Sequence, residues 1–206
     1  MKLYRLPLGP LQTNCYIVGD DNSSDCWIID PGSEGTYLVD LLKERGLEPQ
    51  AILLTHGHGD HIGAVQALVD NYQIPIYIHE KEKEFLTNSQ VNLSAAMGLN
   101  ITVQGDVHYV EDGQILPLGP YNFKVLFTPG HTPGGVCYYG EGVVFAGDTL
   151  FQESVGRTDF PGSNFDDLVL GIQDKLFPLP SETVVYPGHG PETTIGHEKT
   201  YNPFVR

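Results

Sequence analysis

The hydrophobic residues of this chain form two kinds of pattern. Short apolar runs, many of them rich in β-branched and aromatic residues, predict strands. These runs cover residues 15–18, 26–30, 51–54, 76–78, 124–127, 136–139, 143–146 and 183–186. Between some of these predicted strands, apolar residues recur with the spacing of a helix, so the chain combines strands and helices.

Three helical stripes follow from the spacing of apolar residues and from capping signals. They cover residues 38–45, 62–69 and 165–176. Ser33 is a candidate N-cap for the first, Pro75 limits the second, and Ser163 or Asn164 can cap the third. Because the strands first meander and then alternate with helices, we predict an α+β fold of two mixed sheets covered by helices.

The run Thr-His-Gly-His-Gly-Asp-His at residues 55–61 directly follows the apolar residues 51–54. It holds four candidate metal ligands, His56, His58, Asp60 and His61. Neutral imidazole and carboxylate suit zinc or iron, and the intervening glycines leave room for the backbone to curl around a cation. A catalytic zinc usually takes about three protein ligands in all, so four from one segment predict two metals.

Three further strand ends carry a ligand-type residue beside glycine. His131 lies in TPGHTPGG, Asp148 in VVFAGDTL and His189 in VVYPGHGP. Each alone would be read most simply as a turn residue. Together with residues 55–61, they predict that several strands end at one metal site.

Composition limits the choice of function. The 206 residues, 40% hydrophobic and 18% charged, fit a single domain over residues 1–206. A net charge of −15 disfavours a nucleic-acid partner. The chain has no apolar run of about 18 residues and no signal-peptide core, so we expect a cytoplasmic protein without a membrane partner. The three cysteines, Cys15, Cys26 and Cys137, lie in strand-like runs and are expected to be buried free thiols.

The pattern of residues 56–61, followed by His131, Asp148 and His189, resembles the metallo-β-lactamase superfamily over most of the chain. Within it, GDTLFQESVGRTDFPG at 147–162 and PGHGPETTIGHEKTYNPF at 187–204 are similar to the glyoxalase II (hydroxyacylglutathione hydrolase) group. The match is to a short form that lacks the C-terminal helical domain. This resemblance implies a four-layer αββα sandwich with the metals at one edge of the two sheets.

The resemblance also implies a ligand set. His56, His58 and His131 would hold the first metal, Asp60, His61 and His189 the second, and Asp148 would bridge them. The cofactors would be two divalent ions, zinc in the first place, with iron or manganese as alternatives.

The implied activity is hydrolysis of a small acyl thioester such as S-lactoylglutathione. A water shared by the metals would ionise and attack the thioester carbonyl, with Asp60 and Asp148 as catalytic residues. Arg157 lies where the family places a basic residue that grips glutathione. Asp159 stands where the family often has a tyrosine, which is a departure from the glutathione-binding pattern.

Other functions use the same residues. A mononuclear-iron persulfide dioxygenase would need only His56, His131 and Asp148, and a lactonase or β-lactamase-type hydrolase would attack a different acyl group. A non-catalytic metal-binding module is disfavoured because every ligand position of the superfamily is filled. The sequence does not specify an oligomeric state.

Several residues near these motifs have more than one interpretation. Asp30 is either a turn residue or a partner that orients a ligand histidine. Residues 87–107 could form a loop over the site, while the charged residues 80–84 are expected to be a solvated helix face. Phe151 and Phe160 could line the pocket or belong to the core.

Overall fold

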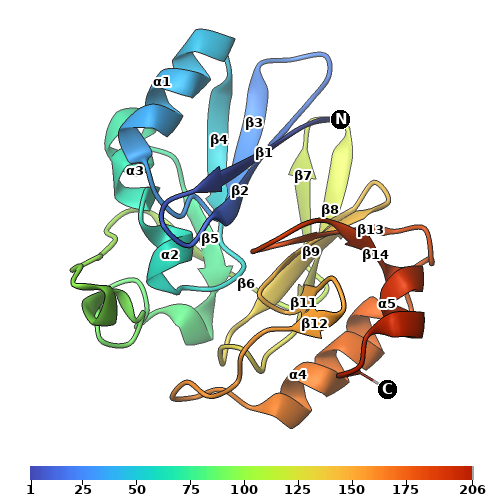
Figure 1. The fold of residues 1–206 in the computed structure, drawn as a ribbon. Coiled ribbons are helices and arrows are strands. Elements are labelled where there is room, and N and C mark those ends of the chain that lie inside the picture. Colours follow the sequence, from blue (N-terminus) through green and yellow to red (C-terminus); the bar gives the residue numbers. More distant parts are fainter. Residues whose placement is uncertain (206) are drawn as a thin grey trace.

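Two six-stranded sheets pack face to face in the computed structural model, which describes residues 1–205 (Figure 1). The first sheet has the order β1-β2-β3-β4-β5-β6, antiparallel from β1 to β3 and parallel from β3 to β6. Its strands are β1 (Lys2–Leu8), β2 (Thr13–Gly19), β3 (Asp25–Ile29), β4 (Glu48–Leu53), β5 (Ile76–His79) and β6 (Val107–Val110).

The second sheet has the order β14-β13-β10-β9-β8-β7, and only its β10–β13 pair is parallel. Its strands are β7 (Ile115–Leu118), β8 (Tyr121–Phe127), β9 (Val136–Gly140), β10 (Val143–Gly147), β13 (Val184–Pro187) and β14 (Thr193–Thr194). A small hairpin of β11 (Leu150–Phe151) and β12 (Ser154–Val155) follows β10. Both sheets are mixed, as predicted.

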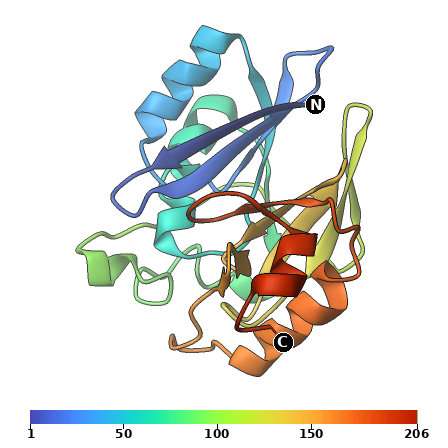
Figure 2. The same ribbon diagram turned by 45° about the vertical axis from the view of Figure 1, so that its right-hand side comes forward.

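Helices cover the outer face of each sheet, and the two views agree on this arrangement (Figures 1 and 2). The helices are α1 (Gly35–Arg45), α2 (Gly59–Ile62), α3 (Val65–Tyr72), α4 (Phe165–Gly171) and α5 (Ile195–Tyr201). Side chains of α1 and α3 pack on the first sheet, and those of α4 and α5 pack on the second. The predicted four-layer αββα sandwich is therefore confirmed.

Strand alternation explains why the core divides into layers. In β4, Ala51 and Leu53 join the apolar layer between the sheets, while Ile52 joins the layer under α1 and α3. All seven residues of β2 are buried, because this strand has covered faces on both sides. This burial explains why residues 15–18, from which the strand was predicted, are all apolar.

Hydrogen bonds between the sheets hold the end of β4 in place. The Tyr138 hydroxyl donates to the Leu54 carbonyl at 2.8 Å, and the Val136 amide donates to the Thr55 carbonyl at 2.9 Å. Both acceptors immediately precede His56. The segment 55–61 therefore starts from a point that both sheets fix.

Two local predictions at the first and second helices were wrong. Glu34, in a left-handed conformation with φ 59°, precedes α1 in place of a Ser33 cap, and its side chain accepts a bond from the Gly9 amide. The second stripe forms two helices, α2 and α3, because the Ala64 amide donates to the Pro31 carbonyl. The chain is thereby tied to the Pro31–Ser33 turn between the two helices.

Other local predictions are confirmed. The Asn164 side chain caps α4 by accepting from the amides of Asp166 and Asp167. The three cysteines are buried free thiols, and burial raises the pKa of Cys26 to about 12 and that of Cys137 to about 11. Within residues 1–205, we find no helix with the length and apolar character that a membrane crossing requires.

Candidate metal centre

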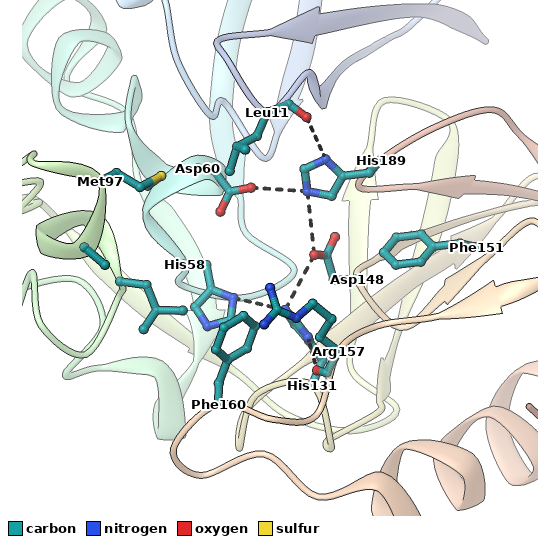
Figure 3. Close-up of a pocket in the computed structure, with 12 residues that line it drawn as sticks. Leu11, His58, Asp60, Met97, His131, Asp148, Phe151, Arg157, Phe160 and His189 are labelled. Carbon is teal, nitrogen blue, oxygen red and sulfur yellow. Dashed lines mark hydrogen bonds and ion pairs between the residues drawn. The ribbon is translucent and has the colours of Figure 1, made fainter.

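Four segments that are far apart in the sequence meet at one end of the two sheets. The run 55–61 follows β4, His131 lies in the loop after β8, Asp148 follows β10, and His189 follows β13. Figure 3 shows Asp60, Asp148 and His189 facing one another, with His58 and His131 beside them. All seven residues predicted as ligands are therefore brought together.

These residues form two groups around Asp148. His56, His58 and His131 can converge on one ion, and Asp60, His61 and His189 on another. The carboxylate of Asp148 lies between the groups, with Oδ2 3.5 Å from His131 Nε2 and Oδ1 3.3 Å from His61 Nε2. His189 Nε2 lies 3.6 Å from Asp148 Oδ2 and 3.2 Å from Asp60 Oδ2. Asp30, His56 and His61 form a third such group that overlaps both, so the division of the ligands between two metal ions stays a prediction.

Hydrogen bonds to Nδ1 define which nitrogen of His56 and His61 faces the centre. The Thr55 hydroxyl donates to Asp30 Oδ2 at 2.6 Å, so it can only accept at its 3.1 Å contact with His56 Nδ1. Asp30 Oδ2 also lies 2.9 Å from His61 Nδ1 and accepts its proton. In the neutral rings, both Nε2 atoms then carry lone pairs that point into the site. Of the two roles that the sequence allows for Asp30, a turn residue or a residue that orients a ligand histidine, its contacts support the second.

Backbone carbonyls orient two further histidines in the same way. His131 Nδ1 donates to the carbonyl of Arg157 at 2.7 Å, and His189 Nδ1 donates to that of Leu11 at 3.1 Å. A carbonyl can only accept, so Nε2 of each neutral ring also presents a lone pair to the centre. His58 differs from the other four, because its Nδ1 is the atom that faces the site.

The resulting arrangement leaves polar atoms without partners. His58 Nδ1 lies 3.1 Å from His56 Nε2 and 3.0 Å from His131 Nε2, and a single proton cannot satisfy three converging nitrogens. His61 Nε2 and Asp148 Oδ1 are buried and make no hydrogen bond among the described residues. Such atoms are costly in a protein interior unless a cation binds them. The donor set and its geometry therefore fit bound metal ions.

Burial and charge act differently on the two groups of candidate ligands. Burial, reinforced by the neighbouring histidines, lowers the pKa of His56 and brings that of His58 to about 3. Burial opposes ionisation of Asp148, yet interaction with the neighbouring histidines, His61 first among them, lowers its pKa to about 2. For His61, burial acts to lower the pKa, but the carboxylates of Asp60, Asp148 and Asp30 together raise it. The two sides of the site thus differ in charge, with His56 and His58 neutral and His61 surrounded by carboxylates.

Close backbone approach at Gly188 completes the site. A Cβ at this position would collide with Asp148 Oδ1 and would lie 2.7 Å from His61 Cε1. Glycine therefore lets β13 come near enough to deliver His189. This explains why glycine accompanies the ligand-type residue at this strand end.

Sequence reasoning missed Glu82, which lies in the charged run predicted to be a solvated face. Its side chain is fully buried, and its carboxylate accepts from the Gly57 amide at 2.9 Å and from the Gly134 amide at 2.7 Å. Burial raises the pKa of this carboxyl group. Glu82 therefore joins the loop that carries His56 and His58 to the loop that carries His131.

A cavity of about 490 Å³ opens onto the site, with Phe151, Phe160 and Arg157 in its wall. The Arg157 guanidinium stacks on the Phe160 ring at 4.5 Å and binds Asp159 through Nε and Nη2. Nη1 is not used in that pair. Leu93, Ala96 and Met97 also line the cavity, so part of the segment 87–107 covers the site as expected. His79, His108 and His197 do not line it.

Comparison with known proteins identifies the family. The profile of the metallo-beta-lactamase superfamily matches residues 8–189, which include every residue of the site. The chain belongs to this superfamily. Its predicted membership is thus confirmed.

Relatives within the superfamily align over nearly the whole chain. The "Probable metallo-hydrolase YqgX" of Bacillus subtilis is 44% identical over 100% of this chain and 98% of its own length. The "Hydroxyacylglutathione hydrolase GloC" of Haemophilus influenzae is 39% identical over 100% of this chain and 98% of its own length. These relatives support a metallo-hydrolase, and the second supports the predicted short glyoxalase II-like form.

Solved structures of the superfamily share the complete architecture. The BLEG-1 B3 metallo-beta-lactamase has a TM-score of 0.94 and 45% identity, and the match covers 99% of both chains. TTHA1623, crystallised in a di-iron-bound form, has a TM-score of 0.88 and 42% identity over 98% of this chain and 99% of its own. A protein of this fold has therefore been crystallised with two iron ions bound.

Replacing Glu82 by alanine is expected to destabilise the protein. Two buried amides would lose their acceptor, at a cost of roughly 1–3 kcal/mol each. Urea unfolding of the metal-free protein measures this loss, and Glu82→Gln should be milder because it keeps one acceptor oxygen. Glu80→Ala is the control, since Glu80 is exposed and lies with Glu82 in the short 3₁₀ helix Glu80–Glu82. Equal stability of Glu82→Ala and Glu80→Ala would contradict the linking role of Glu82.

Proposed function

We propose that this protein is a hydrolase of small acyl thioesters that uses two divalent metal ions. The main observation is that four histidine Nε2 atoms and the carboxylates of Asp60 and Asp148 are directed toward one centre. This centre adjoins a cavity whose lining includes one cationic side chain, Arg157. The similarity to GloC supports a hydroxyacylglutathione as the substrate.

Seven residues would hold the metals. His56, His58 and His131 form one group, Asp60, His61 and His189 form the other, and Asp148 lies between them. We propose zinc as the resident ion, with iron as the alternative supported by the di-iron form of TTHA1623. When bound, the ions would acidify a water molecule and polarise the carbonyl of the substrate.

The residues of the chain position the reactants. Asp60 Oδ2 accepts from the Thr13 hydroxyl at 3.0 Å, which holds this carboxylate toward His189. Phe151 and Phe160 line the cavity together with Arg157. The free Nη1 of Arg157 can donate to a carboxylate of the thiol portion, so we place the leaving thiol on this side.

A second candidate function is hydrolysis of a β-lactam amide. The similarity to BLEG-1 favours it, and the same centre would act on that carbonyl. The thioester remains our first choice because Arg157 offers a partner for the carboxylates of glutathione.

The function is tested by release of free thiol from S-lactoylglutathione. We expect rapid release by the protein loaded with zinc, loss after chelation, and recovery when the metal is restored. A chromogenic cephalosporin and glutathione persulfide, the latter followed by oxygen uptake, are assayed in parallel. Faster turnover of either, with no thiol release from the thioester, would refute the proposal and assign the competing activity.

Changing Asp148 to asparagine should remove activity and weaken metal binding while the fold survives. The decrease in the rate of thiol release should exceed roughly 10–100-fold, the usual effect of removing a residue that hydrogen-bonds to a metal ligand. Metal content by elemental analysis and thermal unfolding are measured together with thiol release. Asp40→Asn, at an exposed position of α1, is the matched control and should behave as the wild type. An active Asp148→Asn protein with full metal content would rule out the central role of Asp148.

Changing Arg157 to alanine should lower kcat/KM for S-lactoylglutathione about 10- to 100-fold, the value of a hydrogen bond to a charged group. With S-lactoyl-N-acetylcysteamine, which lacks the carboxylates of glutathione, the variant and the wild type should have the same kcat/KM. Arg45→Ala on α1 controls for the loss of a surface cation. Equal losses on both thioesters would show that Arg157 does not recognise the thiol portion.

A further inference from the structure

A second cavity, of about 580 Å³, lies next to the first and has no role in the mechanism above. The loop between β1 and β2, the Gly32–Ser33 turn, α2 and residues 97–101 enclose it. Leu11, Asp60 and Met97 line both cavities, so the two meet at the edge of the metal centre. Figure 3 shows these three residues on the side of the centre away from Arg157.

The side chains that line the second cavity are mostly apolar. They are Leu8, Leu11, Met97, Leu99 and Ile101, together with Pro10. Leu11 is 52% exposed and Leu99 53%, so apolar surface of both side chains is open to a ligand. They come from two segments far apart in the sequence, the loop between β1 and β2 and residues 97–101.

The two cavities differ in charge. Arg157 supplies a cation to the first, whereas the lining of the second includes neither lysine nor arginine. Asp60 is its one charged residue, and Oδ2 of that carboxylate is engaged by Thr13 and His189. An uncharged apolar group fits the second cavity, and an anionic group fits the first.

Glycine contacts fix the floor of the second cavity. A Cβ at Gly63 would collide with the Gly32 carbonyl, and a Cβ at Gly59 would lie 2.8 Å from the Cβ of Ser94. The backbones of α2 and the Gly32–Ser33 turn are therefore in direct contact. This side of the cavity is therefore a packed surface.

We propose that the second cavity binds the acyl chain of the thioester and that the enzyme prefers apolar acyl groups longer than lactoyl. This inference rests on the proposed function. The carbonyl would lie at the His/Asp centre, the thiol portion in the first cavity near Arg157, and the acyl chain between Leu11 and Leu99. Each methylene buried there should raise kcat/KM about fourfold, from ~0.8 kcal/mol per CH₂.

The test uses glutathione thioesters of acetyl, butanoyl, hexanoyl and octanoyl groups with the metal-loaded enzyme. We expect kcat/KM to rise along the series, and Leu99→Asp to abolish the preference of octanoyl over acetyl. Leu170→Asp is the matched control, because Leu170 is also 53% exposed but lies on α4, away from both cavities. It should retain the preference.

A binding measurement separates this inference from the proposed function. S-octylglutathione and S-methylglutathione are not hydrolysed, and calorimetry should show tighter binding of the octyl compound, lost in Leu99→Asp and kept in Leu170→Asp. Equal binding of both compounds, or a flat rate series, would overturn the acyl-chain site. If no thioester is hydrolysed but the octyl preference persists, the proposed function fails while the apolar site stands.

Discussion

The convergence of histidine lone pairs at one point is the constraint on which the rest of this structure depends. Thr55, Asp30 and two backbone carbonyls accept the Nδ1 protons of four rings, so that each Nε2 is directed at its neighbours and, in the neutral ring, presents a lone pair to them. Nitrogen atoms about 3 Å apart repel unless a cation lies among them. The inter-sheet bonds at Leu54 and Thr55 and the buried Glu82 resist this repulsion.

Much of this organisation can be predicted from the sequence because its signals are local. Apolar runs in β2, β4 and β10 are continuous since these strands are covered on both faces, and the ligand-type residues begin within four residues of a strand end. The pairing of the ligands into two groups came from the resemblance to the superfamily. Spacing alone does not show that His131 joins His56 and His58.

The remaining features depend on contacts between distant segments. Glu82 looks like part of a solvated charged run, and only the fold shows that Gly57 and Gly134 enclose its carboxylate. The predicted cap at Ser33 failed for a similar reason, since Glu34 is held by Gly9 from another loop. The apolar cavity beside Asp60 draws on four separate segments, none of which indicates a cavity by itself.

The use of main-chain carbonyls to orient His131 and His189 has an evolutionary consequence. Leu11 and Arg157 each offer a carbonyl to a histidine while their side chains line the substrate cavities. A substitution at either position alters the cavity wall but leaves the carbonyl where it is. Substrate range can therefore diverge among descendants of such a protein while the orientation of these histidines is inherited unchanged.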